Sequence, residues 1–173
     1  DLDKLIFYGN TSSWDFLITT YSKCGELGHA FNLFQIIQNN DTIQLSPSTF
    51  MALLKACANA RDLSKGVEIH NSVSKLRLCE TNVFVGSMMI DMYAKCGALE
   101  LAQEVFDNVQ GKDVVLWTIL IGGYANHGDS LKALKCFESM QKEGVFPNDA
   151  TFSCILKACA DERDLEMGME FHT

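Results

Sequence analysis

Apolar residues recur along this chain at the three- and four-residue spacing of amphipathic helices. The segment 83–113 shows the pattern most clearly, with two apolar stripes in succession. The first stripe consists of Val85, Met88, Met89, Met92 and Tyr93, and the second consists of Leu99, Ala102, Val105 and Phe106. Between them Gly97 is suited to the left-handed turn that ends many helices. The segment is therefore predicted to be two helices joined by a tight turn.

This helix-turn-helix pattern is repeated along the chain. Residues 53–70 (LLKACANARDLSKGVEIH) and 155–172 (ILKACADERDLEMGMEFH) are identical at eleven of eighteen positions. The strings YSKCG, YAKCG and YANHG begin at Tyr21, Tyr93 and Tyr124. The offsets between these strings differ, so the chain divides into units of unequal length. The predicted units are 11–46, 47–82, 83–113, 114–148 and a partial unit 149–173, and residues 1–10 are expected to end a preceding unit.

Polar and turn-forming residues mark the ends of the predicted helices. Asp62 and Asp164 stand before second helices, where a short acidic side chain can accept from free N–H groups. Pro147 follows the second helix of the fourth unit, which it cannot continue. One helix pair of this size cannot bury its apolar face alone and must stack on its neighbours. The sequence therefore predicts an all-α, right-handed superhelical solenoid in which the recurring Tyr, Gly, Ala and Phe are packing and turn residues.

Composition limits the chemistry that the chain can perform. The net charge of −8 argues against nucleic acid unless an acidic outer face coexists with a basic inner one. Seven cysteines without framework spacing predict free, packed thiols. His70 and His172 occupy equivalent positions of different units, so no metal site is expected. No catalytic motif and no membrane-length apolar stretch occurs, so no enzyme activity, cofactor, small-molecule substrate or membrane partner is expected. The lack of an initiating methionine suggests a fragment.

The repeated strings resemble the pentatricopeptide repeat family, and in particular its plant-type subclass with repeats of three lengths. VFVGSMMIDMYAKCGALELAQEVFDNVQGKD (83–113) is similar to the short, S-type repeat, and VVLWTILIGGYANHGDSLKALKCFESMQKEGVFPN (114–148) to the P-type repeat. TFMALLKACANARDLSKGVEIH in unit 47–82 and its counterpart in 149–173 are similar to the L-type repeat, whereas 11–46 is irregular. The resemblance implies a single-stranded RNA partner, organellar accessory proteins of RNA editing, and a location in the mitochondrion or plastid.

The resemblance also implies which residues recognise a base in each unit. The fifth and last residues hydrogen-bond the base edge, and the second residue packs against the ring. In the fourth unit these are Thr118 and Asn148 with Val115, a pair that implies adenine. In the third unit they are Ser87 and Asp113 with Phe84, a pair that implies guanine. Because family members bind RNA in the parallel direction, the two units together are expected to select 5′-G-A-3′.

The remaining pairs are less informative. Asp15 and Ser46 match no known pair, Met51 with Asn82 offers one apolar member, and Ser153 begins an incomplete pair. Without the resemblance, the same hydroxyls would be ordinary residues of a helix start, and the Asp and Asn residues would be turn residues. Two further interpretations stay open: a solenoid that binds a protein or peptide, and L-type units that dock an accessory protein.

Overall fold

The structure, a computed structural model, describes the backbone of residues 10–39, 43–78 and 82–170, and the side chains of these residues as far as 160. The expected end of a preceding unit therefore lies, apart from its last residue, outside the described residues. All regular elements in the described part are helices. They are α2 (Thr11–Lys23), α3 (Leu27–Gln38), α4 (Pro47–Ala60), α5 (Leu63–Lys75), α7 (Val83–Lys95), α8 (Leu99–Asn108), α9 (Val114–Asn126), α10 (Ser130–Lys142) and α11 (Asp149–Glu170).

The first helix of every unit begins where the sequence pattern starts a unit. α2, α4, α7, α9 and α11 begin at the first residues of the five units. In each case the residue before the helix caps it, because its side-chain oxygen accepts a backbone N–H of the first turn. The capping residues are Asn10, Ser46, Asn82, Asp113 and Asn148. Each unit boundary is thus a helix N-terminus with a polar cap.

Tight turns join the two helices of a unit. Gly25, Gly97 and Gly128 have φ values of 81°, 78° and 76°, in the left-handed region where glycine carries no side-chain penalty. In the second unit the turn uses Arg61 at a φ of 53°, and the Asp62 side chain then caps α5 by accepting the Lys65 N–H. A hydrogen bond from the Lys65 ammonium holds the pKa of Asp62 below its usual value. The turn and cap predictions at Gly97 and Asp62 are confirmed.

The predicted turn inside the last unit is wrong. α11 is one continuous helix that includes Asp164, which the sequence pattern places at the start of a second helix. At the equivalent place in the second unit, Arg61 adopts a left-handed conformation that is unfavourable for a non-glycine residue. There α5 packs against α4 and α7 and stabilises the break. The acidic cap signal at Asp164 alone therefore does not produce the break.

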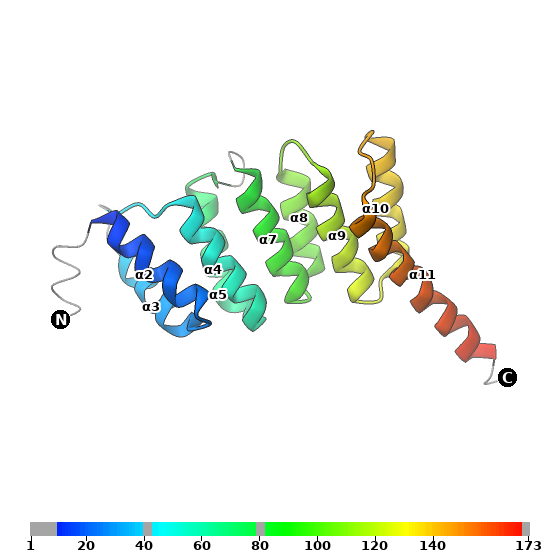
Figure 1. Cartoon of the computed structure of the whole chain (residues 1–173), viewed down its shortest axis with the longest axis horizontal. Coiled ribbons are helices and arrows are strands. Elements are labelled where there is room, and N and C mark those ends of the chain that lie inside the picture. Colours follow the sequence, from blue (N-terminus) through cyan, green and yellow to red (C-terminus); the bar gives the residue numbers. More distant parts are fainter. Residues whose placement is uncertain (1–9, 40–42, 79–81, 171–173) are drawn as a thin grey trace.

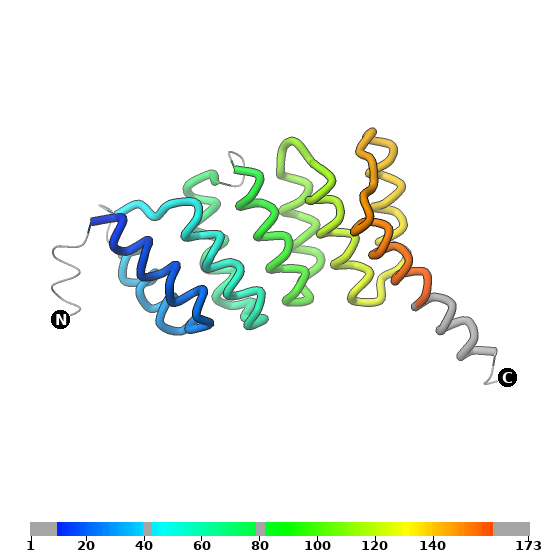
Figure 2. The backbone as a smooth tube through the Cα atoms, viewed as in Figure 1, coloured from blue at the N-terminus to red at the C-terminus, as the bar shows by residue number. Residues whose placement is uncertain are grey.

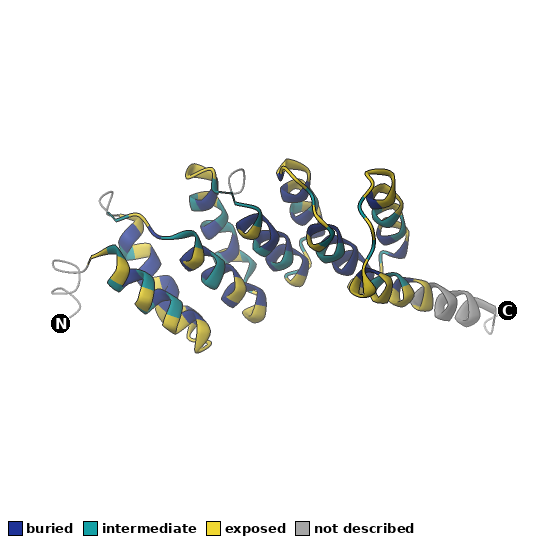
Figure 3. Ribbon diagram, turned by 45° about the horizontal axis from the view of Figure 1, so that its top comes forward, coloured by how far each residue is buried: buried dark blue, intermediate teal, exposed yellow. Residues whose placement is uncertain are grey.

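The helices form two layers. The first helices stack side by side in the order α2, α4, α7, α9, α11, and each second helix packs behind its own unit and against the first helix of the next (Figure 1). The backbone trace advances from one pair to the next with its described ends far apart (Figure 2). Buried residues lie where the layers face each other and where neighbouring units meet (Figure 3). This arrangement is the expected all-α solenoid.

Residues that recur from unit to unit fill the space between the helices. Ala30, Ala102 and Ala133 are fully buried, and the helices pack closely where these small side chains lie. Close approach of α7 and α9 also depends on Gly123, because a Cβ atom there would lie 2.9 Å from Ala94 Cβ. Among the Tyr positions, Tyr21 differs by being partly exposed and stacking on His29. The packing interpretation therefore fits the described positions with this one exception.

His70 makes the stability of the solenoid depend on pH. Burial lowers the pKa of its imidazole, and its Nδ1 lies 2.5 Å from the Tyr93 hydroxyl in the neighbouring unit. Because the unfolded chain takes up this proton at a higher pH than the folded chain, the free energy of unfolding should fall as the pH drops below about 6.5. We expect this pH dependence to weaken in His70→Gln, as measured by urea unfolding between pH 8 and pH 6. The exposed His29→Gln is the matched control, and equal pH slopes for both variants would contradict the assignment.

Candidate nucleic-acid interface

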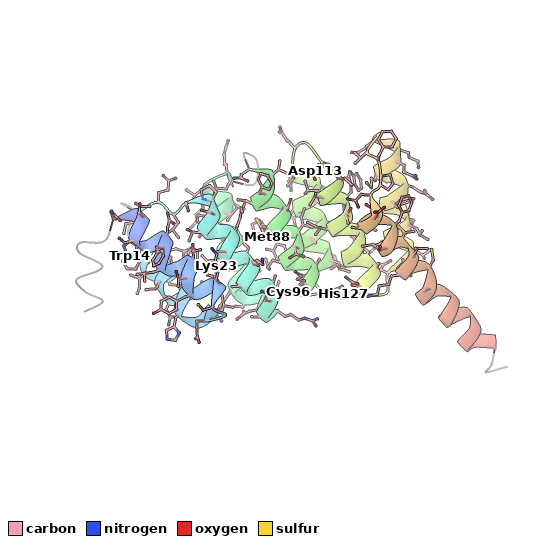
Figure 4. The ribbon with its side chains drawn as sticks, in the orientation of Figure 1. Trp14, Lys23, Met88, Cys96, Asp113 and His127 are labelled. Carbon is pink, nitrogen blue, oxygen red and sulfur yellow. The ribbon has the colours of Figure 1, made fainter. Side chains whose placement is uncertain are left out.

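The residues of the candidate pairs lie along the edge of the solenoid where the first helices begin. Figure 4 shows Asp113 at this edge and Cys96 and His127 at the opposite edge, where α7 and α9 end. The second residue of every unit is exposed, and Phe84 and Val115 are 72% and 51% exposed. Other apolar side chains are exposed as well, for example Leu131 at 66%, so this exposure indicates accessibility and not by itself a binding site. The side chains that would sandwich a base are accessible.

The fourth pair is connected through a third side chain. The Thr118 hydroxyl lies 2.7 Å from the Thr151 hydroxyl, which donates to Asn148 Oδ1 at 2.9 Å. The Thr151 backbone N–H also donates to Asn148 Oδ1 at 2.9 Å, and the Asn148 N–H donates to Thr151 Oγ1 at 3.2 Å. Thr118 is half-buried and Asn148 is exposed. The structure therefore brings the two members of the adenine pair together around one hydroxyl.

The first pair has the same arrangement with an acid in the fifth position. Asp15 Oδ1 accepts the backbone N–H of Ser46 at 3.1 Å and the hydroxyl of Thr49 at 2.5 Å. The Ser46 hydroxyl in turn lies 3.0 Å from the Thr49 hydroxyl. One oxygen of this carboxylate is thus engaged by the protein itself.

The second and third pairs are not joined in this way. Ser87 is 8% exposed, and its hydroxyl donates to the Val83 carbonyl at 2.9 Å. Asp113 is exposed and caps α9, and the described hydrogen bonds include none between it and Ser87. Met51 and Asn82 likewise share no hydrogen bond in the described part, and Ser153 donates to the Asp149 carbonyl. Ser87 is therefore less accessible than the sequence interpretation requires of a base-contacting residue.

Sequence reasoning missed Thr49 and Thr151, which occupy the third position of the second and the last unit. Both are fully buried, and each lies three residues after a capping residue. A polar residue at that spacing is a capping-box signal, since it can return a hydrogen bond to the cap. The strings PSTF and DATF carry this signal. In the third and fourth units, the apolar Val85 and Leu116 stand at the same position.

The capping hydrogen bonds of Asn148 and Asp113 determine which side-chain atom of each residue remains available to a ligand. Asn148 Oδ1 faces the Thr151 N–H, which can only donate, so the amide must be oriented with its oxygen toward the helix. Its Nδ2 donor is then turned away from the cap. Asp113 Oδ1 accepts the Leu116 N–H at 2.9 Å, which leaves Oδ2 as an acceptor. Asn148 thus offers a donor, and Asp113 offers an acceptor.

Basic and acidic residues are nearly equal in number among the described side chains, so most of the net negative charge comes from other residues. Residues whose side chains the structure describes include twelve Lys or Arg and thirteen Asp or Glu. Residues 161–173 alone hold five acidic residues and one Arg. The first helices present four lysines, and Asp91 among their acids is paired with one of them. These lysines are Lys23, Lys55, Lys95 and Lys157. Because residues 161–170 belong to α11, these five acidic residues lie on a first helix too, and the first helices together are not basic.

Other chemistry finds no support among the described residues. These include no group of three or more His, Cys, Asp or Glu that could hold a metal, and no helix long and apolar enough to span a bilayer. His172 lies outside them. Burial raises the pKa of the Cys57 thiol to about 12 and that of Cys136 to about 11, so neither is a reactive thiolate at neutral pH. The described cysteines are free, as expected, but only Cys57 is buried, and the packing prediction is wrong for Cys24 and Cys159, which are exposed.

Stacked helix pairs with polar caps along one edge define a helical-repeat binding scaffold rather than an enzyme fold. Residues 112–161 match the description "PPR repeat family", and residues 12–41 and 87–114 match "PPR repeat". The chain belongs to the pentatricopeptide repeat family.

Relatives in Arabidopsis thaliana agree with this assignment. The pentatricopeptide repeat-containing protein At2g33680 is 37% identical over 94% of this chain and 22% of its own length. The protein At4g18520, named chloroplastic, is 34% identical over 92% of this chain and 30% of its own. At3g26782, named mitochondrial, is 36% identical over 86% and 22%. The chain thus spans less than a third of each of these relatives.

Solved structures confirm the fold class. The crystal structure of the pentatricopeptide repeat protein PPR10 from maize matches 98% of this chain, and 25% of its own, with a TM-score of 0.74 and 18% identity. PPR10 in complex with an 18-nt psaJ RNA element matches the same share of this chain with a TM-score of 0.69 and 18% identity. The all-α superhelical solenoid predicted from the sequence is thus the observed fold.

Proposed function

We propose that this chain is a module that binds single-stranded RNA and recognises one base per repeat, with 5′-G-A-3′ selected by the third and fourth units. The observation that carries the proposal is the cluster of Thr118, Thr151 and Asn148 at the accessible edge. The RNA in the PPR10 complex supports the same class of ligand for this fold. The base assigned to each residue pair and the direction of the RNA are those that the family resemblance implies.

The geometry of the fourth unit suits adenine. The base edge of adenine presents an acceptor at N1 and a donor at N6. Asn148 Nδ2 is the donor that the capping bond leaves available. Thr118 Oγ1 keeps a lone pair whether its proton goes to the Val114 carbonyl or to the Thr151 hydroxyl, each at 2.7 Å. The donor therefore comes from Asn148 and the acceptor from Thr118. Each member of the pair thus has one defined role.

The third unit suits guanine, whose base edge presents two donors at N1 and N2. Asp113 Oδ2 is a free acceptor, and the Ser87 hydroxyl can accept while its proton goes to the Val83 carbonyl. Because Ser87 is nearly buried, the guanine contact depends mainly on the carboxylate. We therefore expect Asp113 to contribute more to base selection than Ser87.

Exposed apolar side chains would hold the bases between repeats. Phe84 stands beside the third pair and Val115 beside the fourth, both at the exposed start of a first helix. Stacking of a base on an aromatic ring such as that of Phe84 is worth about 1–3 kcal/mol and hardly depends on the base, whereas Val115 offers apolar contact without stacking. These two residues are expected to supply affinity, and the polar pairs to supply selectivity.

The family suggests a role for a longer protein that contains this chain. Relatives named chloroplastic and mitochondrial agree with an organellar location, and we propose a role in RNA editing or processing there. Accessory proteins that dock on the L-type units stay a prediction, as does the plant-type subclass itself.

The proposal can be tested by selecting RNA from a random pool with the 173-residue chain at low salt. We expect enrichment of adjacent G-A, with substitution of either base lowering affinity by about 1–3 kcal/mol. An RNA pool without any enriched dinucleotide would contradict base recognition. Binding of peptides in place of RNA would favour the alternative of a protein-binding scaffold.

Asp113→Asn should change the third unit from guanine to adenine. The introduced asparagine can cap α9 as Asp113 does, so folding should be preserved while the free acceptor becomes a donor. Affinity for 5′-A-A-3′ should then exceed that for 5′-G-A-3′, as measured by fluorescence anisotropy with labelled RNA. Asp129→Asn, which alters the equivalent kind of cap on α10, is the matched control and should leave the preference unchanged. An unaltered guanine preference in Asp113→Asn would remove this residue from base selection.

A further inference from the structure

The Thr151 side chain belongs to the unit that follows the fourth pair, yet it contacts both members of that pair. Its hydroxyl is fully buried and lies 2.7 Å from Thr118 Oγ1 and 2.9 Å from Asn148 Oδ1. The family resemblance implies base contact only for the fifth, last and second residues of a unit. The third residue of the next unit has no role in that scheme.

The hydroxyls of Thr118 and Thr151 make more contacts than their protons can serve. Thr118 and Thr151 have one hydroxyl proton each. Three contacts call for such a proton: Thr118 with the Val114 carbonyl, Thr118 with Thr151, and Thr151 with Asn148 Oδ1. Two protons cannot serve three contacts at once, so the direction of the Thr118–Thr151 bond is coupled to the bond that Asn148 receives. A ligand that donates to Thr118 therefore acts on the same network that fixes the Asn148 amide.

We propose that Thr151 is a positioning residue for base selection by the fourth unit, holding Thr118 and Asn148 in one geometry through its hydroxyl. This inference rests on the proposed function and deepens it. Thr151 fixes Asn148 Oδ1 from two sides, with its N–H and its hydroxyl, so that Nδ2 faces outward. Thr151 is buried and acts on the base only through the other two residues.

The first unit supports this assignment by showing the same construction. Thr49 is also fully buried, and its hydroxyl lies 2.5 Å from Asp15 Oδ1 and 3.0 Å from the Ser46 hydroxyl. Both clusters thus connect the fifth residue of one unit, the last residue of the same unit and the third residue of the next. Leu116 and Val85 leave the third and second pairs without such a connection. Among the described pairs, the fifth and last residues of a unit are therefore hydrogen-bonded through a third side chain only where the next unit has a hydroxyl residue at its third position.

Thr151→Val removes the hydroxyl and keeps the branched shape. With the 173-residue chain and RNA hexamers that differ only at the base of the fourth unit, we expect the preference for adenine over guanine to fall about three- to tenfold, the value of one hydrogen bond. The preference for guanine at the third unit should not change. Thr151→Ser should restore the adenine preference. Thr49→Val, which alters the equivalent cluster of the first unit, should leave both preferences as in the wild type.

The outcomes separate this inference from the proposed function. If Thr151→Val keeps the full adenine preference, or if it weakens all hexamers by the same factor, Thr151 does not position the pair, although RNA recognition would stand. If the wild-type chain itself shows no base preference at the fourth unit, the proposed function fails and the inference fails with it. Thermal unfolding of each variant, followed by circular dichroism, verifies that the compared proteins are folded.

Discussion

Replacing Trp117 with alanine is expected to lower the free energy of unfolding by about 3–5 kcal/mol, the usual cost of deleting a buried aromatic side chain. Trp117 is 3% exposed and meets the Phe106 ring edge to face at a centroid distance of 4.6 Å. The contact joins α8 of the third unit to α9 of the fourth. Its loss should therefore weaken the junction between the two units that carry the proposed base-selecting pairs.

Trp117→Phe is the matched control. The indole N–H of Trp117 is buried without a hydrogen-bond partner among the described residues, so phenylalanine removes an unsatisfied donor while it keeps an aromatic ring. We expect this variant to lose much less stability than Trp117→Ala. Urea unfolding followed by circular dichroism gives both values, and hydrogen exchange should place the loss in α8 and α9. A similar loss for both substitutions would contradict the packing role assigned to this side chain.

Apolar spacing and the repeated strings predicted most of this fold. The starts of α2, α4, α7, α9 and α11 coincide with the predicted unit starts because each is marked by a polar cap followed by an apolar stripe. The turns at Gly97 and Asp62 were equally visible, since left-handed glycine and acidic caps are local signals. Local signals succeed where neighbouring residues alone determine the conformation.

Predictions that depend on distant residues were less successful. Asp164 resembles a cap, yet α11 continues through it, since the equivalent turn before α5 is stabilised by the packing of α5 on α4 and α7 and not by its cap alone. Ser87 occupies the expected position but is nearly buried. The bridging role of Thr151 depends on Thr118, which lies 33 residues earlier in the sequence. Such contacts across a unit boundary follow from the stacking of helices and not from spacing within one unit.

The combined change of Thr118→Asn and Asn148→Asp is expected to shift the fourth unit from adenine to uracil. The introduced aspartate can cap α11 with one oxygen, as Asn148 does, and its other oxygen can accept the N3–H of uracil. The introduced asparagine in α9 can donate to a uracil carbonyl. One mismatched base costs about 1–3 kcal/mol, so exchanging preferred and mismatched bases should reverse the order of affinities. The capping bonds remain possible, which makes a general loss of folding unexpected.

Base recognition by the fourth unit is tested most directly by equilibrium binding of the wild-type chain and this double variant to four RNA hexamers. The hexamers differ only at the base that faces the fourth unit, and each retains guanine before it. We predict tightest binding of adenine by the wild type and of uracil by the variant, with the guanine preference of the third unit unchanged in both. Equal weakening of the variant toward all four hexamers, or a retained preference for adenine, would contradict base selection by Thr118 and Asn148.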